Sequence, residues 1–195
     1  YGNAGVDGRP LSEASVGGLD PFSLRACYGE GKRAGEALCY AWAHQFQTPV
    51  QVIRPFHTYG PGMRLDDGRV FADFTADVLA GRDIVMKSDG SAVRAYTYLS
   101  DFTHGLMRVL LKGEDRTAYN IANDEAVVSV TELAAAVARC DPPHVVQVIR
   151  QERKDGYLPS PFSRTIPDVT RLRALGWKPE HGLASGFQRT LRSYR

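Results

Sequence analysis

Cysteine is scarce in this sequence, and long apolar runs are absent. The chain has three cysteines, with no Cys-x-x-Cys pair and no histidine partner at a metal-binding spacing, which argues against a disulfide framework and against a metal site. We expect Cys27, Cys39 and Cys140 to be buried or half-buried free thiols. No apolar run approaches the roughly 18 to 20 residues that span a bilayer, and Tyr1-Gly2-Asn3 lacks a signal-peptide pattern. A cytoplasmic protein is therefore expected.

An excess of charge of one sign is also lacking. The 195 residues contain 24 Lys plus Arg and 22 Asp plus Glu, a formal net charge of +2. This is too close to neutrality to bind nucleic acid or a membrane surface by bulk electrostatics, so we expect neither partner. Any bound anion must be held by individually placed side chains. With 43% hydrophobic residues, the composition is that of a globular protein with a core, not of a disordered or collagen-like chain.

Helical and strand patterns alternate along the chain. Apolar residues at spacings of three, four or their sums predict a helix from Leu24 to about Phe46, and a short β-branched strand follows at 50–53. The Ser129-x-x-Glu pattern is a capping box that opens another helix. Further helices are expected at 70–80, 101–111, 130–139, 169–175 and 183–194, and further strands at 84–86, 96–99, 118–121 and 144–149. The alternation predicts an α/β fold.

Tyr28 and Lys32 are four residues apart on the first expected helix, so both project from one face. A free tyrosine has a pKa of roughly 10, and a nearby lysine cation favours the phenolate, a usable base toward a hydroxyl. The ammonium can also donate hydrogen bonds to a ribose. Taken alone, such a pair can equally be a solvated helix face. Glycines 29, 31 and 35 lie within the same expected helix, so we reject them as a dinucleotide-binding loop, which must follow a strand and open a helix.

Three ordered motifs together resemble the extended short-chain dehydrogenase/reductase family, the NAD-dependent nucleotide-sugar epimerases, dehydratases and decarboxylases. They lie at 25–36 around Tyr28, at 54–62 (Arg-Pro-Phe-His-Thr-Tyr-Gly-Pro-Gly) and at 94–101 (Arg-Ala-Tyr-Thr-Tyr-Leu-Ser-Asp). The resemblance extends to the Leu-Gly-Trp-Lys-Pro segment at 175–179. Within the family, the sequence around Tyr28 looks most like the UDP-glucuronate decarboxylase subgroup.

The resemblance implies the C-terminal part of an NAD-binding Rossmann-like fold with a small α/β substrate-binding domain. Residues 1–60 would belong to the Rossmann-like domain and 61–195 mainly to the nucleotide-sugar-binding domain, with about 100–125 returning to the Rossmann sheet. The family's glycine fingerprint, and the acidic ribose ligand about 20 residues after it, do not occur in these 195 residues. The chain therefore looks like part of a longer enzyme.

The resemblance also assigns roles to single residues. Tyr28 would be the catalytic base and acid at the sugar C4 hydroxyl, and Lys32 would hold the nicotinamide ribose. Pro55 and His57 would lie beside the nicotinamide and the substrate diphosphate, although the family usually has Asn in place of His57, which could instead pack beneath the turn. The arginines expected to bind the nucleotide diphosphate through their guanidinium forks are Arg69, Arg94 and Arg164. A surface salt bridge is the alternative for each arginine.

The implied activity starts with oxidation of sugar C4 by NAD, most like that of a UDP-glucuronate decarboxylase. A 4-epimerase or a 4,6-dehydratase would share this first step. An alternative of another class is a truncated, non-catalytic nucleotide-sugar-binding or dimerisation module. Family members pair through the helix that bears Tyr28 and Lys32, so a homodimer is expected, and we assign Trp42 on that helix to the core. Such enzymes supply activated sugars for polysaccharide or glycan synthesis.

Overall fold

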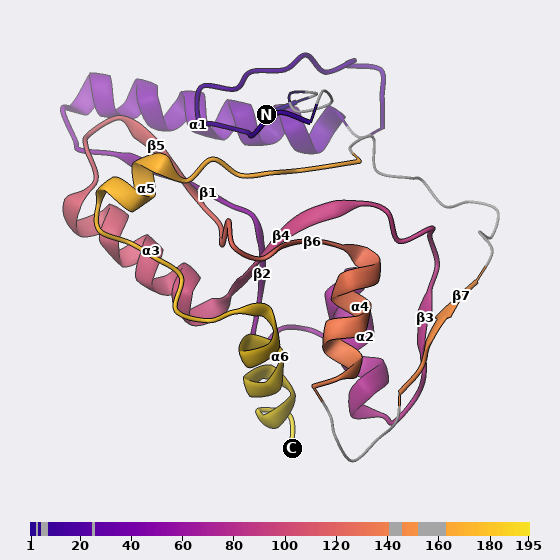
Figure 1. Ribbon diagram of the computed structural model, residues 1–195. Coiled ribbons are helices and arrows are strands. Elements are labelled where there is room, and N and C mark those ends of the chain that lie inside the picture. The colour runs from indigo at the N-terminus through magenta and orange to yellow at the C-terminus, as the bar shows by residue number, and fades with distance from the viewer. Residues whose placement is uncertain (3, 5–7, 25, 141–145, 152–162) are drawn as a thin grey trace.

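The computed structural model describes residues 1–2, 4, 8–24, 26–140, 146–151 and 163–195 (Figure 1). The helices are α1 (Ala26–Phe46), α2 (Val70–Leu79), α3 (Leu99–Lys112), α4 (Val130–Ala138), α5 (Thr170–Ala174) and α6 (Leu183–Arg192). The strands are β1 (Gln51–Pro55), β2 (His57–Tyr59), β3 (Ile84–Met86), β4 (Val93–Tyr98), β5 (Thr117–Ile121), β6 (Val127–Ser129) and β7 (Val148–Arg150). The α/β prediction is confirmed at this level.

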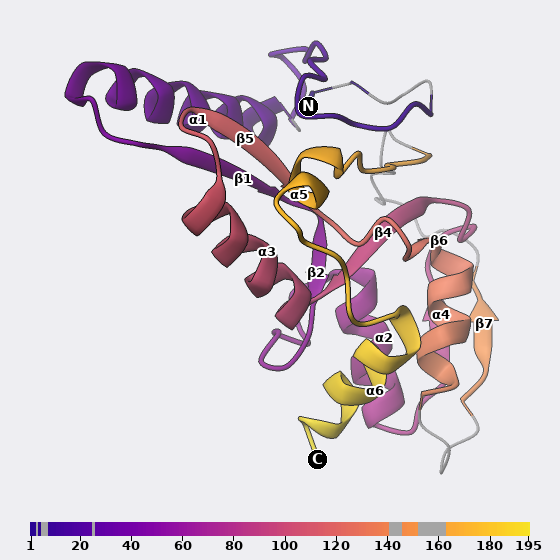
Figure 2. The same ribbon diagram turned by 60° about the vertical axis from the view of Figure 1, so that its left-hand side comes forward.

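One part of the fold is built on the parallel pair of β1 and β5, in which Gln51 lies opposite Thr117 and Pro55 opposite Ile121. Helices α1 and α3 lie on opposite sides of this pair in both ribbon views (Figures 1 and 2). Side chains of α3, β5 and the segment around α5 form a hydrophobic cluster beneath the pair. Its buried members are Val109, Tyr119, Ile121, Leu172 and Trp177.

The other part of the fold joins short strands to three helices. β4 is parallel to β2 and antiparallel to β6, while β3 and β7 form a separate parallel pair. Figure 2 shows α2, α4 and α6 gathered at one end of the molecule, with α1 at the other. These helices share a second and larger hydrophobic cluster, whose largest members include Tyr59, Phe71, Tyr96, Leu133 and Phe187. The fold thus has one apolar cluster on each side of the β1–β2 connection.

Several expected elements are confirmed, and their boundaries show what local patterns miss. The capping box at Ser129 is present, with the Ser129 hydroxyl accepting from the Glu132 amide. Strands β2 and β6, of three residues each, were not expected. The helix expected at 101–111 begins earlier, at Leu99, and Asp101 is buried in its first turn. Part of the strand expected at 144–149 lies outside the described residues, and β7 spans Val148–Arg150.

Expectations about burial on α1 are partly wrong. Cys140 is buried as expected, but Cys27 and Cys39 are exposed. Trp42, assigned to the core, is 57% exposed and packs at a tilt against Phe46, with ring centroids 4.3 Å apart. The physical reason is that α1 buries only alanine side chains in the described structure, so its large apolar residues face outward. No helix in the described ranges is both long and apolar enough to cross a bilayer.

Candidate active site

Tyr28 and Lys32 lie on one exposed face of α1, as the spacing predicts. Tyr28 is 73% exposed and stands in the first turn, and exposed Lys32 follows one turn later. The Lys32 Nζ atom lies 5.6 Å from the centroid of the Tyr28 ring, within the range of a cation–π contact. Glycines 29, 31 and 35 are internal to the helix, so the rejection of a phosphate loop there is confirmed. The helix thus presents a phenol and an ammonium side by side.

A bidentate ion pair fixes α1 against β1. Arg54 on β1 donates from Nε and Nη2 to the two carboxylate oxygens of Glu36, both at 2.7 Å. The same guanidinium donates to the Glu13 carbonyl at 2.9 Å and lies 4.9 Å from the Tyr1 ring centroid. The Glu36 carboxylate raises the pKa of Arg54 above its usual value. Because Glu36 follows Lys32 by one helical turn, this pair sets which way the Tyr28 face points.

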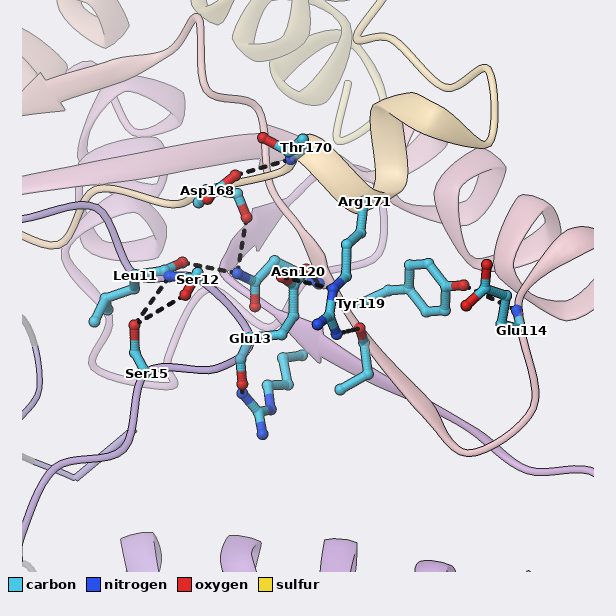
Figure 3. Close-up of polar contacts among 12 residues, drawn as sticks. Leu11, Ser12, Glu13, Ser15, Glu114, Tyr119, Asn120, Asp168, Thr170 and Arg171 are labelled. Carbon is cyan, nitrogen blue, oxygen red and sulfur yellow. Dashed lines mark hydrogen bonds and ion pairs between the residues drawn. The ribbon is translucent and has the colours of Figure 1, made fainter.

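A second polar network holds the segment before α1 to β5 (Figure 3). The Glu13 carboxylate is buried, accepts from the Asn120 backbone amide at 2.8 Å and lies 3.7 Å from Arg171 Nε. The Asn120 side-chain amide donates to the carbonyls of Leu11 and Asp168 at 2.8 and 2.9 Å. Sequence reasoning missed this network. The available signal was an asparagine inside an apolar strand pattern, since a buried amide must find partners.

His57 lies between two aromatic rings where β2 meets β4. The register places His57 opposite Tyr96, with ring centroids 5.6 Å apart, and the Phe71 ring stands edge-on at 6.2 Å. Burial, and to a lesser extent the positive charges of Arg94 and Arg69, together lower the pKa of His57 to about 4. The imidazole is therefore neutral near pH 7. His57 is the first residue of β2 and packs against the Tyr96 and Phe71 rings, where the charges of two predicted ligand arginines act on it.

Two of the three predicted arginines, Arg94 and Arg69, are close enough to act on the charge of this histidine, and the third, Arg164, lies beside β4. Arg94 on β4 is 9% exposed, and its Nη1 donates to the carbonyls of Val93 and Ser163 at 2.7 and 3.3 Å. Arg69 precedes α2, donates from Nε to Asp67 at 2.6 Å and lies 4.9 Å from the Phe71 ring centroid. Exposed Arg164 forms a parallel bridge with Val93, the neighbour of Arg94. Arg94 thus lies on β4, Arg164 is paired with the neighbouring residue of that strand, and Arg69 lies at the start of α2.

The structure therefore sorts the predicted site residues into two groups. Tyr28 and Lys32 form the first group on α1. His57, Arg69 and Arg94 form the second group around β2, β4 and the start of α2, with Arg164 beside it. Pro55 is exposed at the carboxyl end of β1, directly before the turn into β2. The two groups therefore lie on separate elements of the fold.

Comparison with known proteins decides the family. A sequence profile described as the NAD dependent epimerase/dehydratase family matches residues 1–122, more than half of the chain. The chain belongs to this family. UDP-glucuronic acid decarboxylase 5 of Arabidopsis thaliana is 35% identical over 180 residues, covering 91% of this chain and 50% of that protein. UDP-glucuronic acid decarboxylase 1 of Xenopus tropicalis is 32% identical over 198 residues, covering 100% of this chain and 44% of that protein.

Solved structures confirm that the fold is that of the epimerase/dehydratase family. UDP-glucose 4-epimerase of Thermotoga maritima, determined with UDP-glucose, superposes with a TM-score of 0.75 at 25% identity, covering 86% of this chain and 53% of that one. RMD of Pseudomonas aeruginosa, determined with NADPH, gives a TM-score of 0.80 at 22% identity and covers 100% of this chain and 62% of that one. This epimerase/dehydratase-family chain spans about half the length of the curated relatives it matches.

Proposed function

We propose that this chain carries the catalytic tyrosine and the nucleotide-sugar site of an NAD-dependent enzyme that decarboxylates UDP-glucuronate. The observation that carries the proposal is the exposed pair of Tyr28 and Lys32, with the Lys32 ammonium 5.6 Å from the phenol ring. The arginine group around β4 supports a diphosphate ligand. The 35% identity to a UDP-glucuronic acid decarboxylase supports the choice of sugar.

We further propose that residues 1–60 and about 100–125 form the NAD side of the molecule and that 61–195 otherwise form the nucleotide-sugar side. Two separate hydrophobic clusters support this division, one beneath β1 and β5 and the other among α2, α4 and α6. In parallel sheets, ligands bind beyond the carboxyl ends of the strands. Pro55 and His57 follow the carboxyl end of β1, which suits the proposed position beside the nicotinamide.

The residues present fit the nicotinamide end of NAD. Lys32 is an exposed donor that can hold ribose hydroxyls, and Tyr28 lies beside it. NAD held there would supply the hydride acceptor for sugar C4 and, once reduced, the hydride donor for the last step. Tyr28, as phenolate, takes the C4 hydroxyl proton, and the Lys32 cation stabilises that phenolate.

The remaining steps follow from the chemistry of the substrate. The ketone at C4 is β to the C6 carboxylate, so breaking the C5–C6 bond releases carbon dioxide and leaves an enolate that the ketone stabilises. A proton taken up from the solvent adds to C5 and restores the ketone. Tyr28 then returns its proton to the C4 oxygen as C4 is reduced, giving UDP-xylose. Arg94, Arg69 and Arg164 hold the diphosphate throughout, while neutral His57 adds no charge.

Replacing Tyr28 by Phe tests the proposal. General acid–base groups contribute roughly 100-fold to 10,000-fold to rates, so we expect Tyr28→Phe to lower kcat on UDP-glucuronate by about 100-fold or more. The assay uses the complete natural polypeptide that contains this chain, supplied with NAD. Tyr40→Phe is the matched control, because Tyr40 is another exposed tyrosine of α1, at 58% exposure, and should keep wild-type turnover. A Tyr28→Phe enzyme with near-wild-type kcat would refute the proposed role.

We also propose that the protein is a homodimer paired through α1. The outward face of α1 carries Leu38, Trp42 and Phe46 at 70%, 57% and 52% exposure, and exposed apolar patches mark association sites. This face also supports the alternative of a non-catalytic dimerisation module. Retained self-association without UDP binding or turnover would favour that alternative.

A further inference from the structure

The hydroxyl of Tyr96 is buried and has no hydrogen-bond partner. Tyr96 is 1% exposed, and its Oη is one of two buried side-chain nitrogen or oxygen atoms without a partner in the described part of the chain, the other being Arg33 Nε. Leaving a buried donor unpaired is destabilising, and such groups are rare in native proteins. Packing of the ring accounts for the burial of Tyr96, but it does not explain why a hydroxyl without a hydrogen-bond partner lies at this position.

The surroundings of Tyr96 are those of the second group of site residues. Along β4, Arg94 and Tyr96 project to the same face, because side chains alternate along a strand. The neutral imidazole of His57 stands opposite in the register, with its ring 5.6 Å from the Tyr96 ring. Burial raises the pKa of Tyr96 to about 12, although the Arg94 charge acts in the opposite direction. The phenol thus stays protonated and can serve as a hydrogen-bond donor beside a cation.

We propose that the Tyr96 hydroxyl donates a hydrogen bond to a diphosphate oxygen of the bound nucleotide, which makes Tyr96 a substrate-positioning residue next to Arg94. This inference rests on the proposed function, in which the diphosphate of the nucleotide binds to Arg94 and the arginines near it. An anionic oxygen is the acceptor that best offsets the cost of burying this donor, since hydrogen bonds to charged groups are the strong ones.

The burial of the hydroxyl implies that a covering side chain moves when the ligand binds. Arg69 is the side chain suited to this movement. Its side chain is 52% exposed and forms an ion pair with Asp67, two residues away. Its guanidinium lies over Phe71, whose ring centroid is 6.1 Å from that of Tyr96. Turning Arg69 from Asp67 toward a diphosphate would bring a second guanidinium to the anion beside Phe71 and Tyr96.

The substitution Tyr96→Phe tests the inference because it removes one oxygen and keeps the ring. Tyr98→Phe is the matched control: Tyr98 lies two residues further on the same face of β4, and its ring packs against Tyr59 and His181. The dissociation constants of UDP and of uridine are measured by titration calorimetry, the free energy of unfolding is measured in urea, and kcat and KM are measured on UDP-glucuronate.

For Tyr96→Phe we expect about tenfold weaker binding of UDP, unchanged binding of uridine, a raised KM with little change in kcat, and unfolding as in the wild type. Equal UDP affinity in wild type and Tyr96→Phe would overturn the inference, as would no UDP binding by the wild type, or equal losses in Tyr96→Phe and Tyr98→Phe. Tyr96-dependent UDP binding without turnover of UDP-glucuronate would contradict the proposed reaction and leave the inference standing.

Discussion

At the scale of single residues, neighbours determine the charge of His57. Its ring is enclosed by Tyr96 and Phe71, and the nearby cations Arg94 and Arg69 oppose a further positive charge. Burial and these two charges act in the same direction, so the folded state keeps the imidazole neutral. Because His57 does not gain or lose a proton near neutral pH, the positive charge around a diphosphate bound here would stay the same across the neutral pH range.

The lowered pKa of His57 makes stability depend on pH. In the unfolded chain the group titrates near its ordinary value of 6.5, whereas in the folded protein its pKa is about 4. Between these values the unfolded state binds more protons, so the free energy of unfolding falls as the pH drops below 6.5 and levels off below 4. We expect this group to cost about 2 kcal/mol between pH 7.5 and pH 5.

Urea unfolding at both pH values checks this expectation, with His57→Asn as the comparison because it lacks the titrating ring. The difference in pH dependence between wild type and His57→Asn isolates the histidine from the carboxylates. Identical pH dependence in the two proteins would show that His57 is not held neutral by the fold.

Sequence could place Tyr28 and Lys32, because helical spacing alone puts them on one face. It could not place His57 against Tyr96, because that contact depends on the register of β2 and β4, far apart in the chain. The same reason hid the Tyr96 hydroxyl, whose lack of a partner is visible only in three dimensions.

At the scale of elements, α1 is oriented by charge more than by apolar packing. Its buried residues are alanines, which offer little area to hold a helix of 21 residues in one rotation. The Arg54–Glu36 pair supplies a directional contact with both side chains partly buried, at 21% and 32% exposure. Bidentate geometry restricts the angle between β1 and α1, and thereby the direction of Tyr28 and Lys32.

Replacing Glu36 by Gln tests this orienting contact. We expect Glu36→Gln to lower the free energy of unfolding by about 1 to 2 kcal/mol, because Arg54 would keep its partly buried charge without the carboxylate. Glu30→Gln is the matched control on the same helix, since its pair with Arg33 is more exposed, and it should leave stability unchanged. Urea denaturation measures both. Equal effects of the two substitutions would contradict an orienting role for Glu36.

The longer elements were accessible from sequence, whereas β2 and β6 were not. The helices at 70–80 and 130–139 show clear periods, and the capping box marks the start of α4. The prediction that Trp42 is buried was wrong. An apolar stripe on a helix predicts that the stripe contacts some apolar surface, but it does not identify that surface as part of the same chain.

At the scale of the whole molecule, Asp101 links the two hydrophobic clusters. It is 3% exposed at the start of α3, and its carboxylate accepts from the backbone amides of Glu180 and His181 at 3.2 and 3.0 Å and lies 3.0 Å from His181 Nδ1. The Asp101 carbonyl also accepts from Trp177 Nε1 at 2.9 Å. The segment held in this way leads from the cluster beneath β1 and β5 into α6.

Neutralising Asp101 should loosen that link. For Asp101→Asn we expect a loss of about 2 kcal/mol in the free energy of unfolding, because a buried carboxylate with several donors is replaced by a weaker acceptor. Amide hydrogen exchange should rise at Glu180, at His181 and in α6. Asp66→Asn, at an exposed ion pair with Arg64, should change neither measurement. Unaltered exchange in α6 would show that Asp101 does not anchor this segment.

The central claim is that Tyr28 drives decarboxylation of UDP-glucuronate, and the mass of the product tests it most directly. The complete natural polypeptide that contains this chain is incubated with NAD and UDP-glucuronate, and the nucleotide-sugar pool is analysed by mass spectrometry. We expect a product lighter than the substrate by one carbon dioxide, formed by wild type and Tyr40→Phe but not by Tyr28→Phe. A product of unchanged mass, one lighter by a single water, or equal product from Tyr28→Phe would contradict the claim.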